Sequence, residues 1–206
     1  MGREKKTANQ SEPQLFKGLP VHLFPTPGDW ESWLKTNHES STGLWARIAK
    51  KGAPYTSATY AQLLDLALCY GWIDGQKAAY DEASFLQRFT PRRAKSIWSK
   101  TNRDKAVALI EKGLMKPAGL SAVERAKANG EWDRAYDSAS SAEMPEDLAK
   151  ALKENPRAGE FFKTLSSTNR YAILYRLHTA KRPETRAARF QKFMHMLENR
   201  ETIYPQ

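Results

Sequence analysis

Hydrophobic positions recur at helical spacing along most of the chain and alternate with polar positions in only three stretches. The alternation predicts strands over residues 43–50, 72–77 and 84–89, the last two joined by a turn at Asp81-Glu82. Helical spacing and capping residues predict the remaining elements. The expected helices follow N-caps at Asp29, at Ser57 or Thr59, and at Ser99 or Asn102, and then cover 117–128, 145–154, 156–165, 167–180 and 183–199. The pattern therefore predicts an α+β protein with a small antiparallel β-sheet packed with helices, followed by a mainly helical C-terminal region.

The same pattern suggests how the chain is divided. Residues 1–27 are polar and contain several prolines, which predicts a flexible N-terminal lead-in. Residues 28–137 form the expected α+β region, and residues 144–206 form the expected helical region, packed on the first as one unit. The serine-rich stretch between them is the best linker candidate.

Two helices have apolar faces that indicate burial. The helix after Thr59 is apolar around much of its circumference, so we expect it to be central and Cys69 to be a core residue. The last helix carries an apolar stripe at i, i+3, i+4 and i+7, formed by Phe190, Phe193, Met194 and Leu197.

Composition limits the cellular compartments in which we expect this protein. The chain has 206 residues, 40% of them hydrophobic, which suffices for a buried core. No apolar run approaches the roughly 20 residues of a membrane span, and the charged N-terminus lacks the apolar segment of a secretory signal. The single cysteine cannot form an internal disulfide. We therefore expect a cytoplasmic protein without a membrane span, and a eukaryotic source would also allow the nucleus.

The net charge of +10 is concentrated in two segments. Residues 86–107 carry seven Lys and Arg against one Asp, and residues 181–200 carry six against two Glu, which gives +6 and +4. Localised positive charge of this kind attracts an anionic partner. The expected partner is an anionic small molecule or a phosphate-bearing ligand. The alternative is two solvated cationic faces.

A ligand site can be composed from these segments. Guanidinium groups, hydroxyl and amide donors and aromatic rings near a helix start are suited to a phosphate or carboxylate. The predicted ligand-binding residues are Trp72, Arg88, Arg92, Arg93, Ser96, Trp98, Asn102, Lys181, Arg182 and Arg186. In the alternative reading, the arginines pair with acids such as Asp74 or Glu184, and Trp98 fills the core.

Asp74 is the one candidate for catalysis, as a general acid or base. An aspartate in this setting can equally form a turn or a salt bridge. The chain has no glycine-rich phosphate loop, no metal-binding motif and no nucleophile elbow, and its four histidines lack ligand spacing. We therefore expect no cofactor and no metal.

Five motifs follow one another along the chain: Gly71-Trp-Ile-Asp-Gly, Arg88-Phe-Thr-Pro-Arg-Arg with Ser96-Ile-Trp-Ser, Gly130-Glu-Trp-Asp-Arg-Ala-Tyr, Ser166-Ser-Thr-Asn-Arg-Tyr and Lys181-Arg-Pro-Glu-Thr-Arg. Together they resemble the YdeI/OmpD-associated family, whose members are described as bacteriocin-protection proteins. The resemblance runs from about Trp30 to Tyr204. It implies protection against bacteriocins or cationic peptides and association with an outer-membrane porin, without an assigned reaction. Because no export signal is present, we expect a cytoplasmic protein instead of a porin-linked one.

Three functions remain open. The leading hypothesis is a non-enzymatic binding or stress-protection protein with a basic, aromatic-lined groove for an anionic ligand. The second is a nucleic-acid-binding protein, because interleaved cations and aromatics suit phosphate contacts and base stacking. The third is an enzyme that acts on a small anionic substrate with Asp74 as its acid or base. The sequence defines neither the ligand nor the oligomeric state.

Overall fold

The structure is a computed structural model that describes residues 14–206. The chain forms two compact units. The first unit contains residues up to Ser96 together with Lys105–Asn129, and the second contains Ile97–Asp104 together with Gly130–Gln206. Within residues 14–206, no helix has both the length and the apolar character that crossing a membrane requires.

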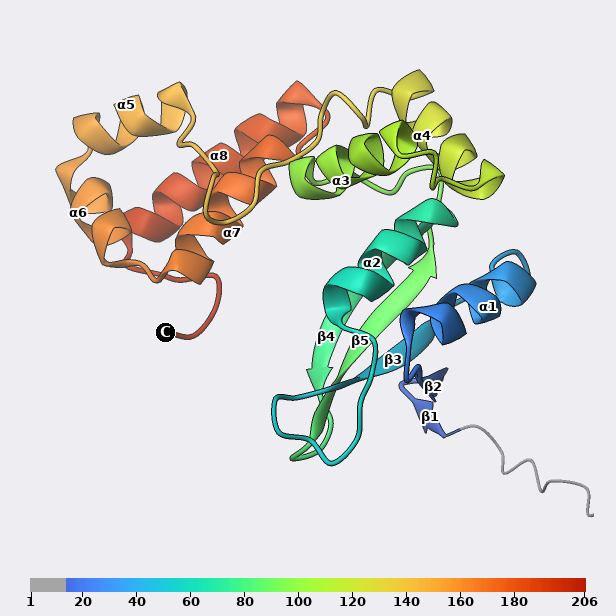
Figure 1. Ribbon diagram of the computed structural model, residues 1–206. Helices are drawn as coiled ribbons and strands as arrows, with labels where there is room; N and C mark the ends of the chain where they lie inside the picture. Colours follow the sequence, from blue (N-terminus) through green and yellow to red (C-terminus); the bar gives the residue numbers. More distant parts are fainter. Residues whose placement is uncertain (1–13) are drawn as a thin grey trace, which may run out of the picture. The chain divides into compact units, whose positions relative to one another are not determined.

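The first unit is built on a five-stranded mixed sheet with the strand order β1-β2-β3-β5-β4 (Figure 1). The strands are β1 (Leu15–Phe16), β2 (Leu19–Leu23), β3 (Leu44–Ala49), β4 (Trp72–Ala79) and β5 (Ser84–Pro91). The three predicted strands are β3, β4 and β5, which pair antiparallel. The α+β class is confirmed, and the sheet becomes mixed because β2 joins β3 in parallel.

The β1–β2 hairpin lies in a segment that the sequence analysis assigned to a flexible lead-in over residues 1–27. That assignment is wrong for Leu15–Leu23, whereas residues 1–13 lie outside the described part of the chain. Lys17 and Gly18 both have positive φ, 47° and 77°, and form a two-residue turn of the kind that joins short antiparallel strands. The parallel pairing of β2 with β3 depends on tertiary structure, so the local pattern did not indicate it.

Helices α1 (Pro27–Asn37) and α2 (Tyr60–Cys69) lie together over one face of this sheet (Figure 1). Thr26 caps α1 in a capping box with Asp29, so Asp29 is the third helical residue and not the predicted N-cap. Thr59 caps α2, which confirms one of its two predicted starts. In both helices a threonine hydroxyl satisfies a first-turn amide that has no helical partner.

An aromatic cluster joins these helices to the sheet. The Trp30 ring of α1 lies 5.6 Å from Phe89 of β5 and 6.1 Å from Trp72 of β4. Both indoles are satisfied: Trp30 Nε1 donates to the Leu63 carbonyl and Trp72 Nε1 to the His38 carbonyl, each at 3.0 Å. The predicted site residue Trp72 is therefore part of the core of the first unit.

The thiol of Cys69 is expected to be unreactive in the folded protein. Cys69 is only 3% exposed, and burial raises its pKa to about 11, so the nucleophilic thiolate is scarce at neutral pH. An aromatic disulfide reagent at pH 7.5 should label the denatured chain completely and leave the native protein unlabelled over the same period. Fast labelling of the native protein would contradict this prediction.

Helices α3 (Lys100–Glu111) and α4 (Pro117–Ala128) follow the sheet in the chain. The Ser99 hydroxyl accepts from the Asn102 amide at 3.1 Å, so the predicted N-cap at Ser99 is confirmed. The segment before α3 pairs with the segment after α4, because Tyr136 N donates to the Trp98 carbonyl at 3.0 Å and Lys100 N to the Tyr136 carbonyl at 2.8 Å. This pairing places Ile97–Asp104 in the second unit.

The second unit is helical, as the sequence predicted. Its helices are α5 (Glu146–Glu154), α6 (Pro156–Thr164), α7 (Ser167–His178) and α8 (Pro183–Glu198). The predicted stripe on α8 lies in the hydrophobic core, with Phe193 and Leu197 buried and Phe190 and Met194 partly buried against it. Leu148 and Leu177 supply fully buried side chains from α5 and α7.

Candidate functional site

A polar cavity of about 540 Å³, here called the β5 pocket, lies within the first unit. It is lined by the 39–42 loop, the Gly75-Gln76 pair of β4, Arg88, Thr90 and Pro91 of β5, and Arg93 and Ser96 beyond that strand. Three of the predicted ligand-binding residues, Arg88, Arg93 and Ser96, therefore line one cavity. Its size is in the range of small-molecule sites.

A β-bulge positions Arg88 in this pocket. Gly75 and Gln76 of β4 lie opposite the single residue Arg88 of β5. The buried Gln87 side chain stabilises the irregular ladder, because its amide donates to the Gly75 carbonyl at 2.9 Å and the Gln76 carbonyl at 3.3 Å. A Cβ on Gly75 would lie 3.6 Å from the Arg88 Cβ, so the arginine stem packs directly on glycine backbone.

Arg88 also has a buried donor. Its Nε is buried and has no hydrogen-bond acceptor among residues 14–206. Trp45, its register partner on β3, is 1% exposed, and its Nε1 likewise lacks an acceptor within that range. Register partners on adjacent strands lie on the same face of a sheet, so two unsatisfied donors are neighbours here. A buried donor left unsatisfied costs about 1–3 kcal/mol, which makes this pair an unusual feature of the sheet.

The 39–42 loop adds hydroxyl groups to the pocket. Gly43, with φ of +136°, allows the loop to approach the end of β5, because a Cβ there would lie 2.8 Å from the Phe89 carbonyl oxygen. The loop therefore presents Ser40, Ser41 and Thr42 at the cavity. Its one acid, Glu39, is 87% exposed at the side chain and lies 3.7 Å from His38.

The two adjacent arginines after β5 have different environments. Arg93 is exposed and lines the pocket, and its backbone amide donates to the Ser96 hydroxyl at 3.0 Å. Arg92 is buried, and its amide donates to the Gly71 carbonyl at 2.9 Å. The pocket thus contains two guanidinium groups and one exposed carboxylate, so its lining is net positive.

Asp74 belongs to the opposite face of the sheet from Arg88. Its register partner is Phe89, the residue after Arg88, and successive strand residues point to opposite faces. The Tyr60 hydroxyl of α2 donates to the Asp74 carboxylate at 2.9 Å. This arrangement supports the interpretation of Asp74 as a structural partner and separates it from the guanidinium of Arg88.

The other predicted site residues belong to the second unit. Trp98 is buried with its ring 4.9 Å from that of Trp132, and Asn102 is buried in the first turn of α3. Arg182 is exposed at the start of α8.

Two cations of the C-terminal cluster are paired with acids of their own unit. Lys181 Nζ lies 2.5 Å from a Glu131 carboxylate oxygen. Arg186 donates to both carboxylate oxygens of Asp147, at 2.6 and 2.9 Å. These hydrogen bonds lower the pKa of Asp147 and raise that of Arg186. The alternative in which the cations pair with acids is thus realised here, although the acids differ from those expected.

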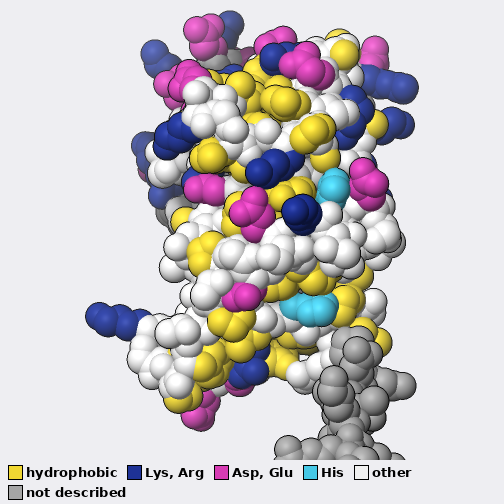
Figure 2. All heavy atoms as spheres, turned by 45° about the vertical axis from the view of Figure 1, so that its right-hand side comes forward, with side chains coloured by type: hydrophobic (Ala, Val, Ile, Leu, Met, Phe, Trp, Pro, Cys, Tyr) yellow, Lys and Arg dark blue, Asp and Glu magenta, His cyan; other side chains and the backbone are white. Residues whose placement is uncertain are grey.

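Charges of both signs are mixed on the surface. On the face drawn in Figure 2, Lys and Arg side chains lie among Asp and Glu side chains and do not gather into one patch. The net charge of +10 therefore overstates how positive this face is.

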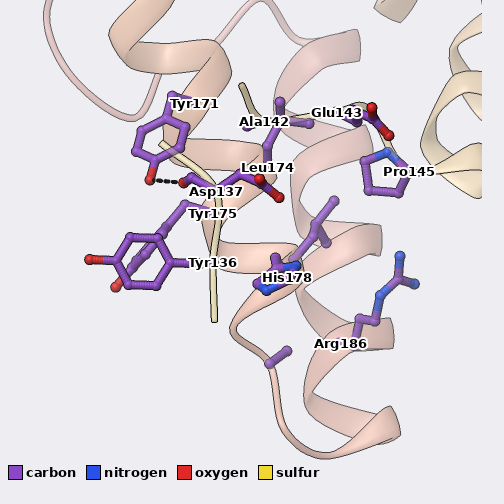
Figure 3. A pocket seen from close by; sticks show the side chains of 12 residues that line it. Tyr136, Asp137, Ala142, Glu143, Pro145, Tyr171, Leu174, Tyr175, His178 and Arg186 are labelled. Carbon is purple, nitrogen blue, oxygen red and sulfur yellow. Dashed lines mark hydrogen bonds between the residues drawn. The ribbon is translucent and has the colours of Figure 1, made fainter. Parts of the chain in front are cut away.

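A second cavity of about 320 Å³, here called the tyrosine pocket, lies within the second unit (Figure 3). Tyr136, Tyr171 and Tyr175 line it together with Asp137, Glu143 and His178. The sequence analysis missed it. The available signal was the i, i+4 spacing of Tyr171 and Tyr175 on one helix, but aromatic residues at that spacing usually indicate core packing.

Comparison with known proteins divides the chain in a similar place. Residues 22–122 match a family model described as "Domain of unknown function (DUF8412)". Residues 141–200 match the model described as "Bacteriocin-protection, YdeI or OmpD-Associated". This stretch is similar to that family. The resemblance noted in the sequence is thus confirmed for residues 141–200, which hold the Ser166 and Lys181 motifs. The other three motifs lie outside this match. No curated protein and no solved structure matches the chain significantly.

Proposed function

We propose that this chain is a non-enzymatic binding protein with a role in bacteriocin protection, and that its first unit holds a small anionic ligand in the β5 pocket. The match of residues 141–200 to the bacteriocin-protection family supports the general role. The β5 pocket belongs to the first unit, outside that match, so the ligand proposal depends on its geometry alone.

The observation that carries the ligand proposal is that two arginines, Arg88 and Arg93, line one cavity. A carboxylate or phosphate in the cavity could accept charge-assisted hydrogen bonds from their guanidinium groups. Arg93 adds a second guanidinium, and the hydroxyls of the 39–42 loop add neutral donors. Together these groups can surround one anionic group with donors from three segments.

The shape of the pocket favours a compact ligand. Two guanidinium groups in a concave site of about 540 Å³ suit one or two anionic groups of a small molecule. A nucleic acid would instead require cations spaced along a strand of phosphates.

The first test of this proposal is calorimetric titration with inorganic phosphate and with succinate. Arg88→Gln is expected to weaken binding about tenfold or more, because a hydrogen bond to a charged group contributes about 1.5–3 kcal/mol. Arg93→Gln should have a smaller effect, since an exposed charge contributes less. Arg125→Gln is the matched control: it removes the same charge from α4 of the same unit, where Arg125 Nη1 donates to Ser121 Oγ at 2.7 Å.

Equal weakening by the Arg88 and Arg125 variants would contradict the pocket, and so would a wild-type protein that binds neither anion. A titration with a single-stranded oligonucleotide serves as a further arm. Oligonucleotide binding that falls steeply with salt, without phosphate or succinate binding, would favour the nucleic-acid alternative.

The protective role has a separate test. A bacteriocin-sensitive bacterium that expresses the wild-type chain should survive bacteriocin better than one that expresses the Arg88→Gln/Arg93→Gln variant. Equal survival of the two strains would show that the β5 pocket is not needed for protection.

A further inference from the structure

The lining of the β5 pocket is polar well beyond its two arginines. Hydroxyl groups line it, together with the Gln76 amide and the Glu39 carboxylate, and the only side chain there without a polar atom is that of Pro91. The hydroxyl groups belong to Ser40, Ser41, Thr42, Thr90 and Ser96. Ligand sites are more often lined mainly by hydrophobic side chains, which bind the hydrocarbon part of a ligand. The uncharged part of a ligand in this pocket must therefore obtain its affinity from hydrogen bonds.

Two serines of the lining retain opposite hydrogen-bonding capacities. The Ser96 hydroxyl accepts from the Arg93 amide at 3.0 Å, so its own proton remains available to a ligand acceptor. The Ser40 hydroxyl donates to the Asn37 carbonyl at 3.4 Å, so its lone pairs remain available to a ligand donor. The pocket thus offers neutral donors and neutral acceptors from different segments of the chain.

Three further side chains of the lining can both donate and accept. Thr42, Gln76 and Thr90 make no side-chain hydrogen bond within residues 14–206. Thr90 lies beside the loop that carries Thr42, because a Cβ on the adjacent Gly43 would lie 2.7 Å from Thr90 Cγ2. The two threonines therefore belong to neighbouring parts of the lining, one from the 39–42 loop and one from β5.

The acceptors of the lining limit which anion is complementary to it. A dicarboxylate or an alkyl phosphate dianion carries acceptor oxygens and no donor, so it can use the guanidinium groups but not the Glu39 carboxylate or the Ser40 lone pairs. A ligand hydroxyl donates and accepts at the same time, so it can pair with either kind of group. The lining is therefore better matched by an anion that also carries hydroxyl groups.

We propose that the ligand of the β5 pocket is a polyhydroxylated anion, either a sugar phosphate or a hydroxy acid. Arg88 and Arg93 bind its phosphate or carboxylate, and its hydroxyl groups hydrogen-bond to Thr42, Thr90 and Gln76. A cavity of about 540 Å³ accommodates a molecule of this size. This inference rests on the proposed anion site and adds the chemistry of the uncharged part of the ligand.

The test compares probes that differ only in hydroxyl groups. The two pairs are glycerol 1-phosphate with propyl phosphate, and tartrate with succinate, titrated calorimetrically into the full chain at pH 8, where all four are dianions. At least one hydroxylated probe is expected to bind about fivefold or more tightly than its hydroxyl-free counterpart. A preference within the phosphate pair would indicate a sugar phosphate, and a preference within the dicarboxylate pair would indicate a hydroxy acid.

Variants assign this preference to the pocket. Thr42→Val and Thr90→Val each remove one hydroxyl and keep the side-chain volume, so each should reduce the preference for the hydroxylated probe about threefold and leave the hydroxyl-free probe unchanged. A general disturbance of the pocket would weaken both members of a pair alike. Thr36→Val is the matched control: it makes the same change on α1 of the same unit, where Thr36 Oγ1 donates to the Ser32 carbonyl at 3.3 Å outside the cavity.

Equal binding within both pairs would overturn this inference and leave the anion site of the proposed function in place. The inference is also overturned if valine at positions 42 and 90 changes the preference no more than valine at position 36. A protein that binds none of the four probes would contradict the anion site itself, and with it the inference that rests on it.

Discussion

Replacing Gly119 with alanine is expected to destabilise the first unit by about 3 kcal/mol, the upper part of the usual range for overpacked cores. Gly119 lies in the first turn of α4, where that helix approaches the C-terminal end of α2. A Cβ at this position would overlap the carbonyl oxygen of Cys69 and lie 2.8 Å from that of Leu68. Because the obstructing atoms are backbone, no side-chain rotation can relieve the overlap, and the two helices have to separate.

The matched control is Gly28→Ala, at the start of α1. There the nearest atom to a new Cβ is Thr26 Oγ1, at an ordinary 3.6 Å. This variant should be neutral or more stable by up to about 1 kcal/mol, because alanine favours the helix. Urea unfolding followed by circular dichroism compares the two. A Gly119→Ala protein within about 1 kcal/mol of the Gly28→Ala protein would show that the helices do not pack this closely.

The sequence predicted helices and strands best where the hydrophobic periodicity agrees with residues that start or end a helix. Helix α4 was predicted with the bounds it has, because Pro117 opens it and Gly130 follows it. The N-cap of α1 was misplaced by three residues, since Thr26 and Asp29 are both good caps and the capping box uses both. The β1–β2 hairpin was missed because its strands are very short and β2 is completed by a parallel partner distant in the chain.

For the candidate site, the sequence could bring together only residues that are close along the chain. Arg88, Arg93 and Ser96 follow one another across the end of β5, and all three line the β5 pocket. The contribution of Trp45 depends on the register between β3 and β5, which no local pattern specifies. The same limitation affected the tyrosine pocket, where Tyr136 contacts Tyr175 of α7, a helix that begins at Ser167, far from Tyr136 along the chain.

Charge counting had a related limit. It located the excess of cations in two segments of the sequence, but it could not distinguish cations with a carboxylate partner from those without one. Lys181 and Arg186 are matched by Glu131 and Asp147, which lie about forty to fifty residues earlier in the chain. Which cations remain available to a ligand is therefore determined by tertiary pairing and not by composition.

Replacing Asn169 with leucine is expected to release the C-terminal segment and to destabilise the second unit by about 3 kcal/mol. Asn169 is 1% exposed, and its Oδ1 accepts from the amides of Ile203 and Tyr204, at 3.1 and 2.9 Å. Its Nδ2 donates to the Tyr204 carbonyl at 3.0 Å and to Gln206 Oε1 at 3.1 Å. In the sequence analysis this asparagine appeared only within the Ser166 motif. In the structure its hydrogen bonds hold residues 203–206 against α7.

Leucine has a similar volume but no hydrogen-bonding groups, so it leaves the two tail amides and the Tyr204 carbonyl without their partner. Thr168→Leu places the same side chain at the adjacent exposed position of α7 and should change stability by less than about 0.5 kcal/mol. Amide hydrogen exchange is the decisive readout, because a local release increases exchange at Ile203 and Tyr204 more than in the core of α7. Unchanged protection of these two amides in the Asn169→Leu protein would show that other contacts, such as that of Arg176 with the Tyr204 hydroxyl at 3.1 Å, hold the segment.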